Sequence, residues 1–380
     1  AYMEILNPTV TFQVGDISRI PFRKADVKNV VHNLVKLSGI DWNSYEISWN
    51  FKTLPLLQLD YRQSTLRATY QVLRYQWREM TWEMKRLEEE NNRIFIEKYK
   101  LEGELVPDVP LEEITVTINP YHRYGGDKTE EELEALLLAD TMHEFISYAV
   151  GCMFGRYALE KPGLILANQG ETIEDYLNQI PDPSFPADDD NVIPMLDGDW
   201  FTDDISERFR KFLRVTFGEN HYEENLQFIE TAIGKDIRKF FLKDFYNDHV
   251  KRYKKRPIYW LFSSPKGSFN ALIYMHRYRP DTVNVVLNDY LREFRAKLTA
   301  HKDHLEAVSI SDSATRGEKT KALKEIEKVK KMIAEMEDYE RDILYPLATE
   351  QIQIDLDDGV KVNYPKFGAA LKPIAGLSAK

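Results

Sequence analysis

The sequence of 380 residues lacks the features of a membrane protein and of a disulfide-stabilised secreted protein. Its one cysteine, Cys152, excludes an intramolecular disulfide and favours a reducing cytosol. No apolar run approaches the roughly 18–20 residues that a membrane-spanning helix requires. Residues 1–20 have neither the basic start nor the apolar block of a signal peptide. We therefore expect a cytoplasmic protein that has no membrane partner.

Motifs for cofactors and metals are also missing. The chain contains no Gly-x-Gly, which dinucleotide-binding and S-adenosylmethionine-binding turns use to bring the backbone close to the ligand. Asn7-Pro8-Thr9-Val10 and Asn119-Pro120-Tyr121-His122 approach the Asn-Pro-Pro-Tyr motif of adenine methyltransferases, but both lack its second proline. One cysteine and no His-x-x-x-His pattern argue against a zinc site. We predict no catalytic, cofactor-binding or metal-binding residue in this chain.

The charge is unevenly distributed. The net charge of −11 and the pI of about 5.4 disfavour nucleic-acid binding over the whole surface, but they allow a local basic patch. From Asp182 to Glu207 there are nine carboxylates and no lysine or arginine. This run lacks the ligand spacing of a calcium loop, so we interpret it as solvated loop and helix N-cap charge.

Apolar periodicity predicts a mainly α-helical fold with small β elements. The longest helix begins after Ser64 and runs to about Lys100, with a heptad seam from Leu66 to Leu101. At 1.5 Å per residue it would be roughly 55 Å long. Two final helices, at about 281–307 and 318–346, predict an antiparallel helical hairpin. Shorter elements are predicted as helices at 24–38 (ending at Gly39), 129–156, 203–217, 221–233 and 235–253, and as strands at 114–118 and 352–356.

The densest positive charge lies between Lys235 and Arg256, with nine lysines and arginines against three aspartates. Two aromatic-rich runs separated by Ser-Ser-Pro-Lys-Gly follow it and predict a β-hairpin. Mobile cations on a rigid support suit contact with phosphates. The alternative is a solvated helix face that pairs with the acidic run at 182–207, and both interpretations stay open. The predicted nucleic-acid-binding residues are Lys251, Arg252, Lys254, Lys255, Arg256, Lys266, Arg277 and Arg279.

Several long segments resemble one protein family. The strongest is the stretch from Tyr253 to Phe294, which contains KKRPIYWLFSSPKGSFNALIYMHRYRPDTVNVVLNDYLREF. Further matches are Tyr148–Tyr157, Asp188–Pro194, Phe228–Glu230 and Gly234–Arg238. The start, with Leu6-Asn7-Pro8-Thr9, Val14-Gly15-Asp16-Ile17 and Ile20-Pro21, is similar to the end of a target-recognition domain. These segments resemble the C-terminal region of PglX, the adenine-specific DNA methyltransferase family of BREX phage-defence systems.

The resemblance implies a longer parent protein that methylates adenine N6 in host DNA with S-adenosylmethionine. The chain starts at Ala1 and already alternates like a strand from Thr9 to Val14, so we expect it to be part of such a protein, without the catalytic core. The expected segments are the end of a target-recognition domain at 1–22, connecting and long spacer helices at 23–128, a helical domain with the basic hairpin at 129–280, the helical hairpin at 281–348, and a strand and tail at 349–380.

Two functions are compatible with these observations. In the first, the chain is the non-catalytic specificity and scaffold half of the methyltransferase and helps to bind and position double-stranded DNA. Its partners would then be DNA and the N-terminal methyltransferase half of the same protein. In the second, the chain is a protein-interaction scaffold that docks other BREX components. The long helices suit either role, because a helical bundle fixes the distance between the parts at its ends.

Overall fold

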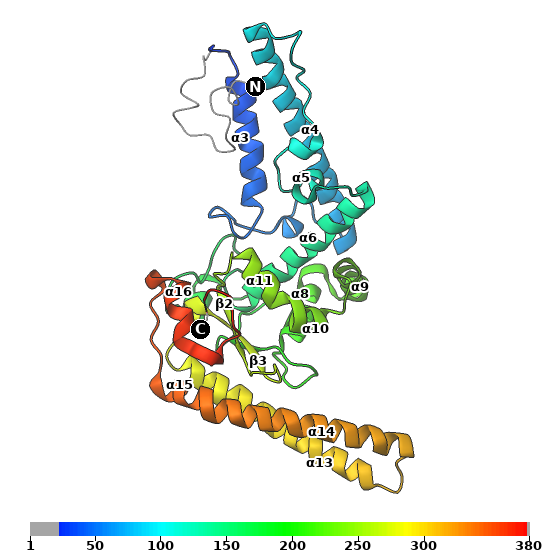
Figure 1. The fold of residues 1–380 in the computed structure, drawn as a ribbon, viewed down its shortest axis with the longest axis vertical. Helices are drawn as coiled ribbons and strands as arrows, with labels where there is room; N and C mark the ends of the chain where they lie inside the picture. Colours follow the sequence, from blue (N-terminus) through cyan, green and yellow to red (C-terminus); the bar gives the residue numbers. More distant parts are fainter. Residues whose placement is uncertain (1–22, 378–380) are drawn as a thin grey trace. The chain divides into compact units, whose positions relative to one another are not determined.

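A computed structural model describes residues 23–377. The chain forms two compact units, and each unit is assembled from two separate stretches of sequence. Unit 1 comprises the residues up to Trp42 together with Arg74–Glu134, and unit 2 comprises Asn43–Leu73 together with Ala135–Lys380. Figure 1 shows the elements coloured along the chain.

Unit 1 contains most of helices α3 (Lys28–Asn43) and α4 (Leu66–Tyr99), the helices α5 (Pro120–Tyr124) and η2 (Leu111–Glu113), and the start of α6 (Glu130–Met153). The first turns of α4, up to Leu73, belong to unit 2. The predicted long helix is confirmed as α4, and six of its seam residues are buried: Leu66, Tyr70, Leu73, Trp77, Met84 and Leu87. A capping box starts α6, in which Thr129 N donates to Glu132 (2.9 Å) and Glu132 N donates to the Thr129 hydroxyl (3.2 Å).

The core of unit 2 contains a three-stranded antiparallel sheet in the order β1-β3-β2. The strands are β1 (Val192–Pro194), β2 (Tyr259–Ser263) and β3 (Asn270–Tyr274), so the predicted hairpin is confirmed. Trp260 pairs with Ile273, and both are fully buried. The helices before the hairpin are α7 (Ile173–Gln179), α8 (Ile205–Phe217), α9 (Tyr222–Ile233), α10 (Ile237–Phe240), the π-helix η4 (Phe241–Phe245) and α11 (Tyr246–Arg252).

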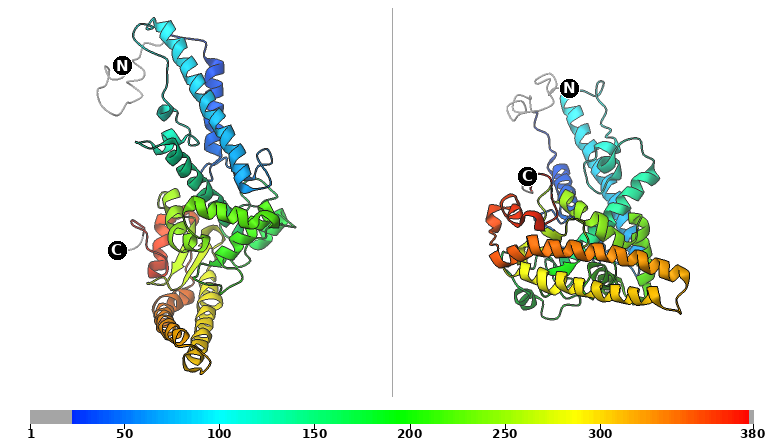
Figure 2. Two further views of the ribbon diagram at one scale, coloured as in Figure 1. Left: turned by 90° about the vertical axis from the view of Figure 1, so that its right-hand side faces the viewer. Right: turned by 60° about the horizontal axis from the view of Figure 1, so that its bottom comes forward.

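The predicted antiparallel helical hairpin is confirmed as α13 (Glu293–Ile310) and α14 (Arg316–Tyr339), which run side by side in Figures 1 and 2. Ala322, Ile326, Val329 and Met336 form the buried seam of α14. The π-helix η7 (Glu340–Leu344) then shifts the buried face by one residue, so that Leu344 is buried. The neighbouring elements are α12 (Thr282–Val285), the π-helix η6 (Val286–Arg292), α15 (Tyr345–Glu350), η8 (Leu356–Asp358), α16 (Val360–Asn363) and η9 (Tyr364–Ala370).

The mainly α-helical class with small β elements is confirmed, whereas three local predictions are wrong. α3 continues through Gly39 to Asn43, so the glycine does not end the helix. Residues 114–118 and 352–356 do not form strands. Within 23–377, no helix is long and apolar enough to cross a membrane. The expected end of a target-recognition domain at 1–22 lies outside the described residues, and the other expected segment boundaries stay predictions.

Candidate nucleic-acid interface

The turn between β2 and β3 presents a lysine at the surface. Ser264 closes the turn, because its amide donates to Phe269 O (3.0 Å) and its hydroxyl accepts from Phe269 N (3.0 Å). Gly267 has a φ of +74°, a conformation that favours glycine, and its amide donates to Ser264 O (2.8 Å). The turn therefore has a defined shape, with Lys266 exposed on it.

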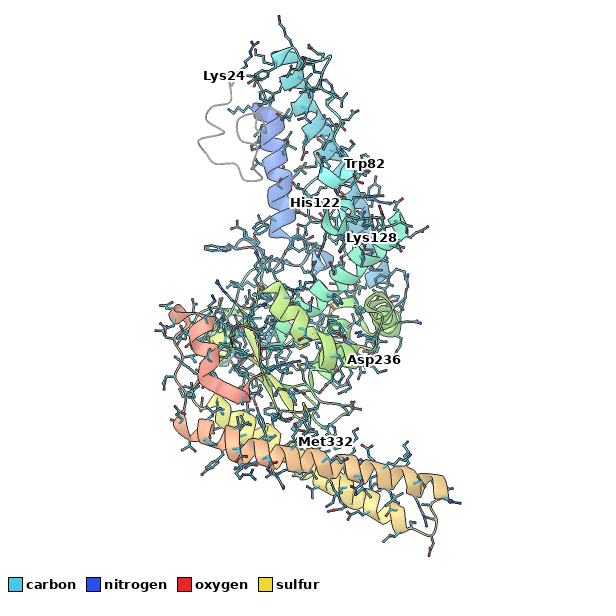
Figure 3. The ribbon with its side chains drawn as sticks, in the orientation of Figure 1. Lys24, Trp82, His122, Lys128, Asp236 and Met332 are labelled. Atoms are coloured by element: carbon cyan, nitrogen blue, oxygen red, sulfur yellow. The ribbon has the colours of Figure 1, made fainter. Side chains whose placement is uncertain are left out.

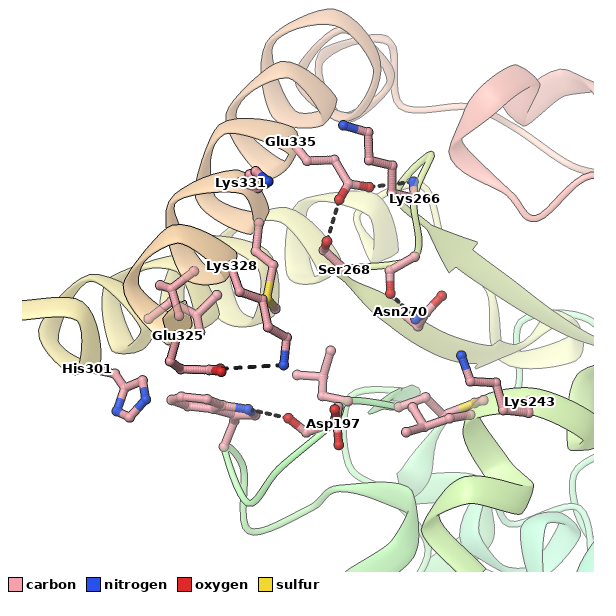
Figure 4. A pocket seen from close by; sticks show the side chains of 18 of the residues that line it. Asp197, Lys243, Lys266, Ser268, Asn270, His301, Glu325, Lys328, Lys331 and Glu335 are labelled. Atoms are coloured by element: carbon pink, nitrogen blue, oxygen red, sulfur yellow. Dashed lines mark hydrogen bonds and ion pairs between the residues drawn. The ribbon is translucent and has the colours of Figure 1, made fainter. Parts of the chain in front are cut away.

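Helix α14 holds this turn through a buried carboxylate. Glu335 is only 7% exposed, and its carboxylate accepts hydrogen bonds from the Lys266 amide (2.5 Å) and from the Ser268 hydroxyl. Figure 4 shows these two bonds joining the turn to the helix. Glu335 thus fixes the position of the turn, and with it the position of Lys266, relative to the helical hairpin.

A cavity of about 940 Å³ opens beside this junction, within unit 2. Its walls are the β2–β3 turn, α13, α14, the segment from Met195 to Trp200, and the segment from Lys235 through α10 to Lys243. Figure 4 shows Lys328 from α14 and Lys243 from η4 on different walls of the cavity. Seven lysines line it, and we call them the groove lysines: Lys235, Lys239, Lys243, Lys266, Lys324, Lys328 and Lys331.

The groove lysines give the cavity a positive charge in an acidic protein. Four carboxylates share its lining, so the net charge of the lining side chains is +3. Lys235 pairs with Asp244 (2.5 Å) and Lys328 with Glu325 (3.4 Å). Among the ion pairs of the described residues, these are the two that involve groove lysines. Free ammonium groups around one opening are suited to phosphate, which lysine binds as a point charge.

The chemistry of the lining indicates which part of a nucleic acid it would contact. Among its residues there is no arginine, the side chain that most often reads guanine with two hydrogen bonds. Asn270, which also lines the cavity, donates its amide to Gly267 O (3.0 Å). Contacts of lysine with phosphate fix the position of a duplex but carry no sequence information. The cavity is therefore suited to holding the sugar-phosphate backbone of a nucleic acid.

Four of the predicted nucleic-acid-binding residues lie together at the end of α11. Lys251, Lys254, Lys255 and Arg256 are all exposed, and they precede β2, whereas Lys266 follows it. We call these four residues the α11-end cluster. Lys254 and Lys255 have φ values of +51° and +62°, which are unusual for lysine. The cluster and the groove thus lie at opposite ends of β2.

Two other predicted residues lie inside the protein. Arg277 is 4% exposed, and its guanidinium donates to the carbonyls of Asp188 (2.7 Å) and Asp189 (3.0 Å). Arg252 is largely buried and pairs with Asp248 (3.1 Å) and Glu46 (3.8 Å). Both side chains hold segments of unit 2 together, so we leave them out of the proposed interface. Arg279 is exposed and lies 3.5 Å from Asp281.

The acidic run at 182–207 pairs with one residue of the basic run. Arg238 lies close to Asp199 (2.5 Å), Asp204 (3.2 Å) and Glu207 (3.7 Å). Arg238 therefore shows the pairing that the alternative interpretation of the basic run expects, but its side chain is largely buried and not solvated. No group of three or more potential metal ligands occurs in the described residues.

Asn119, which the sequence placed near a methyltransferase motif, caps α5. Its side-chain oxygen accepts from Tyr121 N (3.2 Å), and its amide donates to Leu111 O (2.7 Å) and Ile114 O (2.9 Å). It is fully buried. The side chain thus has a structural role in unit 1.

Sequence reasoning did not place Lys324, Lys328 and Lys331 in the site. These residues recur at intervals of four and three, which puts them on one face of α14. The face adjoins the seam residues that pack the helical hairpin. The regular spacing of these lysines is visible in the sequence. The sequence does not show that the fold brings them close to Lys266 and to η4.

Comparison with known proteins agrees with the resemblance found in the sequence. No family model matches the chain. It is 34% identical over 392 aligned positions to the adenine-specific methyltransferase BrxX of Escherichia coli O9:H4 (strain HS), covering 98% of this chain. It is also 34% identical over 394 positions to the adenine-specific methyltransferase PglX of Lacticaseibacillus casei (strain Zhang), covering 99% of this chain.

The chain is homologous to part of the PglX and BrxX methyltransferases. It spans about a third of the length of these relatives, 32% of BrxX and 31% of PglX. The alignment covers nearly all of this chain, so it includes both units and the segments that form the groove. The activity of the full-length relatives therefore applies to this chain only as a proposal.

Proposed function

We propose that this chain is the scaffold part of a BREX-type, PglX-like adenine-specific DNA methyltransferase and that it holds double-stranded DNA by its phosphate backbone. The groove lysines are the observation that carries the proposal. They come from three separate segments that the fold gathers around one opening. A chain with a net charge of −11 repels DNA over most of its surface, so a local excess of lysines is the place where a polyanion would bind.

The homology to adenine-specific methyltransferases supports DNA as that partner. In this proposal the N-terminal methyltransferase part of such a protein carries out methylation in the cytoplasm, as one step of phage defence. The chain described here supplies backbone contacts, and base recognition lies elsewhere. The α11-end cluster provides a second, smaller set of phosphate contacts.

The proposal is tested by replacing Lys324, Lys328 and Lys331 with glutamine. A matched control replaces Lys319, Lys321 and Lys330, which lie on the same helix but do not line the cavity. Both triple variants change the charge equally. We expect only the groove variant to bind duplex DNA more weakly, by about tenfold or more, and to do so equally for duplexes of unrelated sequence. Equal affinities of the two variants would refute the proposal.

A further inference from the structure

The groove also presents apolar side chains, which contacts between lysine and phosphate do not use. Three of the residues that line the cavity are apolar and partly exposed, so a ligand inside it can reach them: Trp200, Leu242 and Met332. We call these three residues the apolar lining. Figure 3 shows Met332 on α14. An apolar surface inside a cavity is stabilised when an apolar or aromatic group of a ligand covers it.

Two residues of the apolar lining each have a groove lysine about one helical turn away. Met332 follows Lys328 by four residues on α14, and Leu242 follows Lys239 by three residues in the helical run from α10 into η4. Residues at these spacings are neighbours on a helix surface, with Cβ atoms roughly 5–6 Å apart. A nucleotide has the matching arrangement, because its sugar separates an anionic phosphate from a flat base with two π faces.

The volume of the cavity also exceeds what contact with a paired backbone requires, since lysines on an open surface reach phosphates equally well. The volume of about 940 Å³ lies at the upper end of the range of about 300–1,000 Å³ for pockets that enclose small ligands. Ser268 and Asn270, which also line it, already donate hydrogen bonds within the protein. The lining thus suits the face of a base, and a base bound by its face is held whatever its identity.

Trp200 offers a ring whose position is fixed by the protein. Its Nε1 donates to Asp197 O (2.8 Å), and its ring packs against Phe294 at a steep angle, with 5.4 Å between the ring centroids. Stacking of a base on such a ring stabilises complexes with unpaired nucleic acid.

We propose that the groove takes an unpaired nucleotide of the bound DNA, with its phosphates on the groove lysines and its base against the apolar lining. This inference rests on the proposed function and narrows its ligand to DNA that contains an unpaired nucleotide. Removing a base from a duplex costs free energy, and the cost is least where the base is already unpaired. DNA with an unpaired nucleotide therefore binds more tightly than fully paired DNA.

The test measures the binding of three fluorescent duplexes by anisotropy: one fully paired, one with a single bulged thymidine, and one whose bulged nucleotide lacks its base. The duplex with the abasic bulge is the control for the bend and flexibility that any bulge introduces. We expect the thymidine bulge to bind about tenfold more tightly than the abasic bulge.

Two variants test the part of the apolar lining. Trp200→Ala and Met332→Ala should each bring the affinities for the two bulged duplexes closer together, because each removes a contact with the base. Met332 is a partly exposed residue of a helix, so its variant keeps the test valid if Trp200→Ala does not fold. Leu323→Ala is the matched control, because Leu323 is a 56% exposed apolar residue of the same helix that does not line the cavity.

Three outcomes would overturn the proposal. One is equal affinity for the thymidine bulge and the abasic bulge, because the base would then make no contact. Another is a preference for the thymidine bulge that Trp200→Ala and Met332→Ala both leave intact, which would place the base elsewhere. The third is a peptide of alternating glutamate and leucine that binds more tightly than every duplex and displaces them, which would assign the groove to an acidic protein segment.

The proposed function fails by a different result, so the two failures are distinguishable. It fails when the variant with glutamine at positions 324, 328 and 331 binds the fully paired duplex as tightly as its matched lysine control does. Weaker binding of the paired duplex by that variant, together with equal affinity for the two bulged duplexes, overturns only the inference about the unpaired nucleotide.

Discussion

At the scale of single residues, His249 ties the end of α11 to the first strand of the hairpin. It is 1% exposed, and its Nε2 accepts hydrogen bonds from Ile258 N (3.2 Å) and Tyr259 N (3.1 Å). A nitrogen that accepts two hydrogen bonds cannot also carry a proton. Burial, followed by the nearby charges of Arg252 and Arg156, lowers the pKa of His249 well below its usual value.

This environment predicts a loss of stability in mild acid. The folded pKa of His249 lies below the unfolded value of about 6.5, so the unfolded state binds the proton first as the pH falls. We expect the free energy of unfolding to drop by about 1.4 kcal/mol per pH unit below 6.5 from this residue. Urea denaturation at pH 7.5 and 5.5 measures it. His249→Gln, which keeps an acceptor, should remove that part of the pH dependence, and an unchanged dependence would contradict the assignment.

Positive charge can be removed at Lys254 and Lys255 without adding strain to the backbone. Both have positive φ, where a residue with a Cβ is disfavoured by roughly 1–2 kcal/mol and glycine is not. We expect Lys255→Gly to keep or raise the melting temperature and to reduce the salt slope of DNA binding by about one contact. Calorimetry and fluorescence anisotropy measure the two effects. An unchanged slope would exclude Lys255 as a DNA contact, and a lower melting temperature would contradict the backbone argument.

At the scale of elements, the contact between the β2–β3 turn and α14 positions one wall of the groove. Glu335→Ala removes the acceptor for the Lys266 amide and the Ser268 hydroxyl. We expect the variant to lose about 1–3 kcal/mol of stability and the amide of Lys266 to exchange its hydrogen faster. Hydrogen exchange measured residue by residue gives the exchange rate of this amide directly. Unchanged protection of Lys266 would show that the turn is held by its own Ser264–Phe269 bonds.

The helices were largely predictable, because their apolar periodicity reflects burial on one face. Two apolar alternations misled the strand predictions. Ile114, Val116 and Ile118 are buried, but the amides of Thr117 and Ile118 donate to the Asp41 carboxylate instead of to a strand. The carbonyls of Ile352 and Ile354 accept from Tyr278 and Gln169 side chains. Alternation indicates burial, but it does not show which partner satisfies the backbone.

The candidate site was predictable only in part. The basic run and the hairpin were visible in the sequence, and Lys266 lies in the groove as well as in the predicted set. Arg277 could not be recognised as an interior residue, since its partners are backbone carbonyls far away in the sequence. The lysines of α14 were missed for the same reason, because their neighbours are determined by tertiary packing.

At the scale of the whole molecule, an acidic chain brings seven lysines to one cavity in unit 2. The groove lysines and the α11-end cluster both belong to unit 2, whereas the described part of unit 1 is acidic. We interpret this division as placing the proposed contacts with the DNA backbone in unit 2. The chain is 34% identical to BrxX and PglX along 98–99% of its length, so the corresponding groove can be tested in those relatives as well.

The salt dependence of DNA binding tests the central claim most directly. Fluorescence anisotropy with a short duplex at several salt concentrations gives the slope of log affinity against log salt concentration for the unmodified chain and for the two triple variants. Each lost phosphate contact lowers the slope by about 0.9. We predict that Lys324, Lys328 and Lys331→Gln lowers it by about two to three, and that the Lys319, Lys321 and Lys330 control leaves it unchanged. Equal slopes in all three proteins would contradict a DNA-binding groove.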